Sequence, residues 1–474
     1  MIRRLKIRGL VSLLVAFVAL PVFAASAPAE GCRIASVRWQ GERDADIDAQ
    51  VQQLVGKPCA AWDEKRVRLV RDYENSGFLA ASLSGSVDSA GILSIAFNRG
   101  SAWVWAAPEN LDSGATKPEV FRRLAGIEEG ENVSLLDLER SERKLARLGY
   151  YEKTAPARLF RDPSRNRIVP AYSMRRARVS EAEGVLTYSS EENVWEGRLD
   201  VELYNILGTA RDLRLEGFTG ETSRHLDAYY KEPWIFGSAW NVVLRGNLDE
   251  EQVEKADDST VVERTVTGEV GITRDIGFDF SLGVYLGMSE DDKHSTFEMS
   301  YVSLDRFVLP RRGWRLQSSL TWKMDRPDTL ENYLRAVAGA TAFYPLYGNF
   351  IVRFAGQAGG IFPAGAALRR TDLFALGGMD SFKGMEYRFV RSRAYGFSEM
   401  AILWQDGYDL SIEAFYQPGL YRRLDPGHGW AREQDYGIAF TQYRGSWSVN
   451  LYYALRNGEN YLDGVIGFGL KSLF

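Results

Sequence analysis

The sequence predicts a β-rich membrane protein: an antiparallel transmembrane β-barrel of about sixteen strands that follows two small α/β domains. The first observation is that apolar residues alternate with polar or small residues from about residue 180 to the end of the chain. The second is the composition, with 12% aromatic residues and 45 glycines, which suits a barrel with aromatic girdles. The third is that no apolar run after residue 25 is long enough to cross a bilayer as a helix.

The balance of charged residues and the small numbers of His and Cys limit the classes of function that the sequence can support. Lys and Arg number 58 against 63 Asp and Glu, so the chain has no basic excess and nucleic acid is not a predicted partner. Three His and two Cys leave little material for a metal site. The sequence contains no Gly-rich phosphate loop and no nucleophile elbow. We therefore predict no cofactor, no metal and no enzymatic activity.

Residues 1–25 are predicted to be a cleaved secretory signal peptide. Four basic residues among the first eight precede an apolar stretch over residues 10–23, and small residues follow from Ala24 to Ala27. A membrane anchor is the weaker alternative, because the apolar stretch is short for a bilayer span. Export would place the chain in a compartment where disulfides persist.

Residues 32–100 are predicted to form the first α/β domain, with the order β-α-α-β-β. Its strands are expected at residues 33–40, 79–87 and 92–97, and its amphipathic helices at 46–55 and 63–75. Cys32 and Cys59, the only cysteines, flank the first helix. Two free buried thiols remain an alternative, but export favours a disulfide.

Residues 101–177 are predicted to repeat this order as a second domain. A strand is expected from residue 103, a short helix at 118–124 and a longer helix after Ser134. Asp137, three residues after Ser134, gives an arrangement close to a capping box. Strands near residues 155–160 and 168–174 complete the unit.

Both domains resemble POTRA (polypeptide-transport-associated) domains. The first is similar to the first POTRA domain of two-partner secretion transporters in its cysteine pair and in the segments Gly56-Lys57-Pro58-Cys59, Tyr73-Glu74-Asn75-Ser76-Gly77-Phe78 and Gly91-Ile92-Leu93. The second resembles the next such domain in the segments Glu128-Glu129-Gly130-Glu131, Leu138-Glu139-Arg140 and Leu148-Gly149-Tyr150.

Residues 178–474 are predicted to form the barrel. Its strands are expected to begin near residues 181, 193, 210, 223, 238, 259, 277, 294, 312, 331, 348, 393, 409, 433, 445 and 463. A long segment over about 359–391 does not show the alternation, and long loops in compact folds are usually functional or disordered. The last strand ends in Phe468, Leu470 and Phe474, which resembles the C-terminal signal for insertion of outer-membrane barrels.

The long segment carries a second resemblance, through the run Leu376-Gly377-Gly378-Met379-Asp380-Ser381-Phe382-Lys383-Gly384-Met385. This run looks like the motif of the sixth loop of the Omp85 superfamily, which folds into the lumen between strands eleven and twelve. The family arginine is replaced by Lys383, and the acidic residue expected on strand thirteen is replaced by Gln417. Glu399 resembles the family glutamate of strand twelve. Glu413 lies four residues before Gln417 and so shares a strand face with it, because alternate residues of a strand point to the same side. Glu413 is therefore either a substitute partner for Lys383 or an ordinary lumen carboxylate.

Two further features are expected to be structural only. His225, His294 and His428 are far apart in the sequence and are predicted to lie in loops. The acidic run at residues 249–258 is predicted to be a solvated loop.

The resemblances imply an outer-membrane polypeptide transporter of a Gram-negative cell, most like two-partner secretion transporters, with its POTRA domains in the periplasm. The implied partners are an exported polypeptide client in extended form, the lipid bilayer of the outer membrane, and the barrel-assembly machinery that inserts the chain itself. An outer-membrane assembly factor (insertase) of the same superfamily is the nearest alternative. A passive porin and a barrel hydrolase are alternatives from other classes.

Overall fold

The computed structural model describes residues 32–112, 116–177, 180–189, 194–220, 223–254, 260–324, 330–364, 366–379, 381–407, 409–424, 429–444 and 447–473. The predicted signal peptide, His428 and Phe474 lie outside these residues. The chain divides into two compact units, one up to Trp103 and the other from Val104 to Phe474. The second unit contains both the second α/β module and the barrel.

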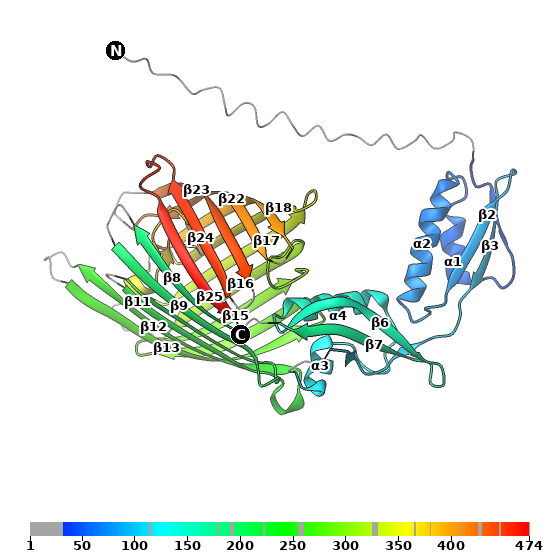
Figure 1. Ribbon diagram of the computed structural model, residues 1–474, viewed down its shortest axis with the longest axis horizontal. Coiled ribbons are helices and arrows are strands. Elements are labelled where there is room, and N and C mark those ends of the chain that lie inside the picture. Colours follow the sequence, from blue (N-terminus) through cyan, green and yellow to red (C-terminus); the bar gives the residue numbers. More distant parts are fainter. Residues whose placement is uncertain are drawn as a thin grey trace, which may run out of the picture. The chain divides into compact units, whose positions relative to one another are not determined.

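The first unit is a three-stranded sheet packed against two helices (Figure 1). Its elements are β1 (Ser36–Trp39), α1 (Ala45–Gln52), α2 (Ala60–Glu74), β2 (Ser82–Val87) and β3 (Ile92–Asn98). The sheet order is β1-β3-β2, with β1 parallel and β2 antiparallel to β3. Asp44 caps α1 by accepting hydrogen bonds from the backbone N–H groups of Asp46 and Ile47. Helix α1 ends three residues before the predicted end, where a turn leads into Gly56 with φ +83°.

The core of this unit is formed by apolar residues of every element, and a disulfide closes one side. Fully buried side chains include Ile34, Ile47, Val51, Leu93 and Ile95. The Cys32–Cys59 disulfide joins the residue before the sheet to the start of α2, with the two Cα atoms 5.6 Å apart. This disulfide fastens the N-terminal segment to the helical layer.

The second α/β module is built on the long strand β7 (Arg167–Arg176). Strand β6 (Tyr151–Asp162) pairs with it antiparallel, while β4 (Val104–Trp105) and β5 (Glu109–Asn110) both pair with it in parallel. Helices α3 (Pro118–Ala125) and α4 (Leu135–Arg147) complete the module. Ser134 caps α4 by accepting a hydrogen bond from Asp137 N. The predicted single first strand is therefore two short strands, and β6 is longer than predicted.

The barrel consists of sixteen antiparallel strands, as predicted, and each predicted start lies within three residues of the observed one. Strand β25 pairs with β8 to close it, from Ile466 opposite Tyr188 to Leu473 opposite Glu181. The strands are β8 (Glu181–Ser189), β9 (Val194–Ile206), β10 (Arg211–Thr219), β11 (Ser223–Glu232), β12 (Trp240–Glu254), β13 (Thr260–Ile276), β14 (Phe280–Ser289), β15 (Lys293–Val302), β16 (Gly313–Met324), β17 (Tyr333–Pro345), β18 (Phe350–Phe362), β21 (Ala394–Asp406), β22 (Leu410–Arg422), β23 (Trp430–Arg444), β24 (Trp447–Arg456) and β25 (Val465–Leu473). A short 3-10 helix, η2 (Ile235–Gly237), lies between β11 and β12.

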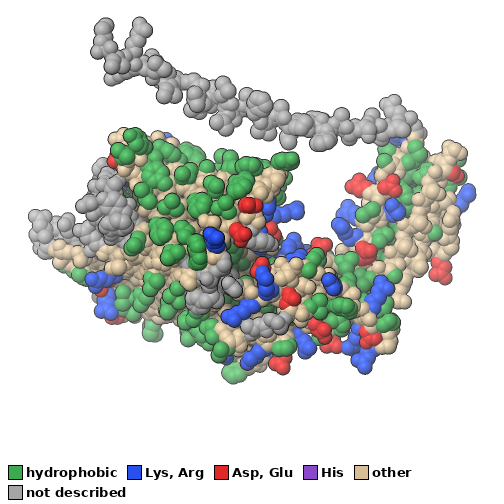
Figure 2. Space-filling view, in the orientation of Figure 1, with side chains coloured by type: hydrophobic (Ala, Val, Ile, Leu, Met, Phe, Trp, Pro, Cys, Tyr) green, Lys and Arg blue, Asp and Glu red, His purple; other side chains and the backbone are tan. Residues whose placement is uncertain are grey.

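The alternation seen in the sequence separates two faces of the barrel wall. On β14, Val284 and Leu286 are exposed outward, whereas Tyr285 between them is buried inside. Apolar side chains cover much of the barrel face turned to the viewer in Figure 2. Phe468 and Leu470 of the predicted insertion signal lie on the outer face of β25. None of the helices among the described residues has the length and apolar character needed to cross a bilayer.

The second module contacts the barrel through the turns at one end, which we call the module end. Arg147 of α4 lies 2.6 Å from Asp279 in the turn between β13 and β14. Tyr150 donates a hydrogen bond to Asp212 at the start of β10 and is 3% exposed. Burial raises the pKa of Tyr150. These contacts position the module at this end of the barrel.

Candidate functional site

The loop between the eleventh and twelfth strands, β18 and β21, covers residues 363–393, and we call it the lumen loop. It contains η3 (Arg370–Asp372) and the paired strands β19 (Phe374–Leu376) and β20 (Val390–Ser392). Phe382 at its tip is fully buried, with its ring centroid 5.7 Å from that of Phe397 and 6.0 Å from that of Tyr421. These partners lie on β21 and β22, so the tip packs against the barrel wall.

The glycines of the motif allow the tip to fold in this way. Gly377 has φ +122°, and a Cβ there would lie 2.0 Å from the carbonyl oxygen of Glu386. Gly378 also has a positive φ, of +83°. Gly384 N donates a hydrogen bond to Asp435 Oδ2 at 3.0 Å, and a Cβ on Gly384 would lie 2.9 Å from the other oxygen of that carboxylate. The tip therefore depends on residues without a side chain.

Lys383 contacts both acids that the sequence suggested as partners. Its Nζ lies 2.6 Å from Glu399 Oε2 and 3.7 Å from Glu413 Oε1. The same ammonium lies 4.5 Å from the ring centroid of Phe415. Gln417 takes a different part: its Oε1 accepts a hydrogen bond from Lys383 N, and its Nε2 donates one to Ser381 O. Glutamine is suited to this role because it has both a donor and an acceptor, whereas a carboxylate only accepts.

Two further side chains complete the tip site, and the sequence analysis missed both. Arg353 of β18 lies between the two acids, with Nη2 2.6 Å from Glu399 Oε1 and Nη1 2.9 Å from Glu413 Oε2. Two cations thus face two carboxylates in a cluster whose four side chains are 5–18% exposed. The second side chain is Asp435, which accepts the hydrogen bond from Gly384 N. It lies directly opposite Gln417 in the register of β22 and β23. Because alternate residues of a strand point to the same face, the sequence pattern of β22 and β23 would have placed Gln417 and Asp435 on the lumen side.

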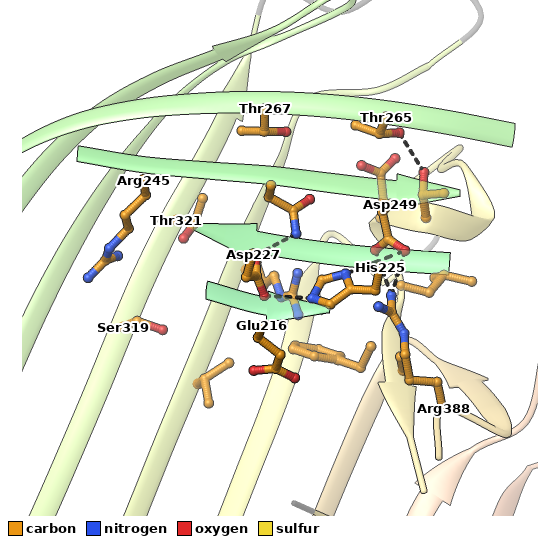
Figure 3. Close-up of a pocket in the computed structure, with 18 of the residues that line it drawn as sticks. Glu216, His225, Asp227, Arg245, Asp249, Thr265, Thr267, Ser319, Thr321 and Arg388 are labelled. Atoms are coloured by element: carbon orange, nitrogen blue, oxygen red, sulfur yellow. Dashed lines mark hydrogen bonds and ion pairs between the residues drawn. The ribbon is translucent and has the colours of Figure 1, made fainter. Parts of the chain in front are cut away.

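A second group of ion pairs holds the base of the lumen loop. Arg388 donates two hydrogen bonds to Asp249, at 2.6 and 2.7 Å, and Figure 3 shows it reaching from the loop to the β12 wall. Arg391 lies 2.5 Å from Glu251 Oε2 and is almost fully buried. The prediction of a solvated loop at residues 249–258 is wrong for its first part, since β12 continues to Glu254. The side chains of Asp249 and Glu251 lie on the inner face of this strand, where they bind the loop arginines.

The prediction that the histidines lie in loops is also wrong for the two that the structure describes. His225 lies on β11, with Nε2 2.5 Å from Asp227 Oδ2 (Figure 3). His294 lies on β15, with Nε2 2.8 Å from Glu269 Oε1. Both rings point into the lumen because period two places them on the inner face of their strands.

The lumen loop leaves two cavities inside the barrel. One, of about 810 Å³, is lined by polar residues that include His225, Thr267 and Arg388 (Figure 3). The other, of about 560 Å³, is lined by Lys383, Arg353 and the loop between β15 and β16. Within the part of the chain that the structure describes, no three His, Cys, Asp or Glu side chains are grouped to hold a metal ion.

Fold and site together define a class: an outer-membrane β-barrel with a lumen loop held by ion pairs and with α/β modules preceding it. Residues 287–414 match the Omp85 superfamily domain, so the barrel carries a domain of this superfamily. The matched residues run from β14 to β22.

Two solved structures with TM-scores above 0.5 share the fold at low sequence identity. CdiB from Escherichia coli is 14% identical, with 96% of this chain and 93% of that chain covered and a TM-score of 0.57. CdiB from Acinetobacter baumannii is 11% identical, with 94% and 90% covered and a TM-score of 0.53. BamA from Haemophilus ducreyi lacking POTRA domains 1–3 is 14% identical, with 93% and 100% covered and a TM-score of 0.48. No curated protein matches the chain in sequence.

Proposed function

We propose that this chain is a two-partner-secretion type of transporter, which moves an extended polypeptide through its barrel. The observation that carries the proposal is the attachment of the lumen loop. Its tip is held to the wall by side-chain ion pairs and amide hydrogen bonds, while the barrel ladder is complete without it. The loop can therefore move away from the barrel wall without breaking the hydrogen bonds between the barrel strands. The fold shared with two CdiB structures over nearly the whole chain supports the same proposal.

In this proposal the α/β modules are the two POTRA domains, with residues 32–100 and 101–177 as their extents, and they lie in the periplasm. The order β1-β3-β2 leaves β2 at an edge, and β6 is an edge of the second sheet. An extended client would add a strand to such an edge, because its backbone can complete the unpaired hydrogen bonds with little demand on sequence. The signal peptide over residues 1–25 and insertion by the barrel-assembly machinery belong to the same proposal.

Site-specific photo-crosslinking in cells that express the full chain tests it. A photoreactive phenylalanine analogue would replace Phe160, an exposed residue on β6, and Thr267, which lines the larger cavity. A third variant would carry it at Ile466, on the outer face beside the β25–β8 seam. We expect one exported polypeptide to crosslink at both Phe160 and Thr267. Crosslinks to nascent barrel proteins at Ile466, with none at Thr267, would instead identify an assembly factor.

A further inference from the structure

The loop between β15 and β16 covers residues 303–312 and lies at the module end of the barrel. Its base is a hairpin in which Asp305 Oδ1 accepts hydrogen bonds from the backbone N–H groups of Arg311 and Arg312, at 3.0 and 3.2 Å. The base is therefore fixed, and residues 306–310 extend from it. We call this segment the strap.

The strap reaches across the mouth of the barrel. Arg306 Nη2 donates a hydrogen bond to Oε1 of Gln405 on β21, at 3.2 Å. The next residue, Phe307, contacts Tyr204 on β9, with the ring centroids 5.7 Å apart. In the closed order of the barrel, β9 is six strands from β15 in one direction and six strands from β21 in the other. Consecutive residues of the strap thus contact distant parts of the wall, so the strap lies over the lumen.

The strap also lines the smaller cavity, of about 560 Å³. Phe307, Leu309 and Pro310 contribute to its lining, together with the buried Leu304 at the base of the loop. Lys383, at the tip of the lumen loop, lines the same cavity. The cavity therefore lies between the strap and the tip. An extended polypeptide that enters it from the module end meets the strap first.

The second α/β module supports the strap through Gly149, which follows α4. The ring of Phe307 packs against this glycine, where an added Cβ would lie 3.3 Å from three of the ring carbon atoms. Gly149 has φ +79°, which a residue with a side chain rarely adopts. Arg147 and Tyr150, close to it in the chain, bind the turn between β13 and β14 and the start of β10. A shift of the module would therefore remove the surface on which the ring rests.

We propose that residues 306–310 close the module end of the smaller cavity, and that a shift of the second module opens this cavity to an extended polypeptide. The contacts of the strap suit such a movement. The hydrogen bond to Gln405 and the ring contact to Tyr204 can break while the hairpin at the base and the barrel ladder stay intact. The role in client entry rests on the proposed function, whereas the closure of the cavity does not.

The test measures how fast a thiol behind the strap reacts in the full chain in detergent micelles. Ser411 is 5% exposed, lines the smaller cavity and lies opposite Gln405 in the register of β21 and β22. The two native cysteines are joined in a disulfide, so Ser411→Cys supplies the reactive thiol. We expect fluorescein maleimide to label it slowly, and at least about fivefold faster in combination with Phe307→Ala, as for the loss of one edge-to-face ring contact.

Two further variants separate the strap from the module. Arg306→Gln shortens the side chain that reaches Gln405, so it should also speed labelling, and it serves if Phe307→Ala does not fold. Arg147→Gln weakens the attachment of the module, so it should speed labelling by itself but add little to Phe307→Ala, because the module acts through that ring. Phe236→Ala is the matched control, since Phe236 also lies in a module-end turn but is fully exposed. It should leave the rate unchanged.

Heat-modifiable gel mobility identifies the variants that are folded. Labelling as slow in folded Phe307→Ala or Arg306→Gln as with the unchanged strap would overturn the closure. Effects of Arg147→Gln and Phe307→Ala that multiply in full would overturn the link to the module. Neither result bears on the proposed function, which the crosslinks at Phe160 and Thr267 test separately. Faster labelling without those crosslinks would refute the proposed function and leave the closure standing.

Discussion

Replacing Lys383 by alanine should release the tip of the lumen loop while the barrel stays folded. The substitution removes an ion pair of 2.6 Å to Glu399, whose side chain is 5% exposed, and a longer contact to Glu413. Both carboxylates keep Arg353 as a partner, so the full cost of about 3–5 kcal/mol for breaking a buried pair does not apply. The loss of one hydrogen bond to a charged group costs about 1.5–3 kcal/mol.

A loss of about 2 kcal/mol changes the ratio of released to seated loop by roughly 30-fold. Single-channel recording in planar bilayers measures this ratio as the time spent in the high-conductance state divided by the time spent in the low-conductance state. We expect that ratio to rise by roughly 30-fold in Lys383→Ala, with heat-modifiable gel mobility unchanged as the sign of a folded barrel.

Lys383→Arg is the matched control, since it keeps the charge and supplies the donor fork of the family residue. Its conductance should stay close to that of the wild type. An alanine variant with wild-type gating would refute the reasoning, and so would an arginine variant as open as the alanine variant. Either result would mean that the tip is held by Phe382 and the backbone contacts and not by the Lys383 ion pair.

Three other predictions concern the loop and the first unit. Gly377→Ala should raise the open fraction more than Lys383→Ala, because its Cβ would meet a backbone oxygen at 2.0 Å; the same bilayer recording checks this. Replacing Cys32 and Cys59 by serine should destabilise residues 32–103 by about 3–4 kcal/mol, read from hydrogen-exchange mass spectrometry of the full chain, and intact protection would contradict it. The hydrogen bond from Arg43 lowers the pKa of Asp48, so its contribution to the stability of that unit is present above about pH 4 and is lost as the pH falls through the depressed value. The stability difference between wild type and Arg43→Gln should therefore shrink on going from pH 6 to pH 3, and a constant difference would exclude this role.

The sequence by itself determined the barrel and the place of its loop. Period-two alternation reports which side of a strand is buried, and this local signal located all sixteen strands. The break in alternation at the lumen loop is equally local. The pairing of Lys383 with Glu399 could be predicted as well, but through the family motif and not through the pattern itself. The role of the terminal Phe474 stays a prediction.

Only the tertiary structure decided which charges meet across the lumen. Arg353 and Asp435 reach the tip from strands that lie on either side of it in the sequence, and Asp249 reaches the base from β12, more than a hundred residues earlier. Alternation places each of these side chains inside, but the register and closure of the barrel set their height and their opposite partner.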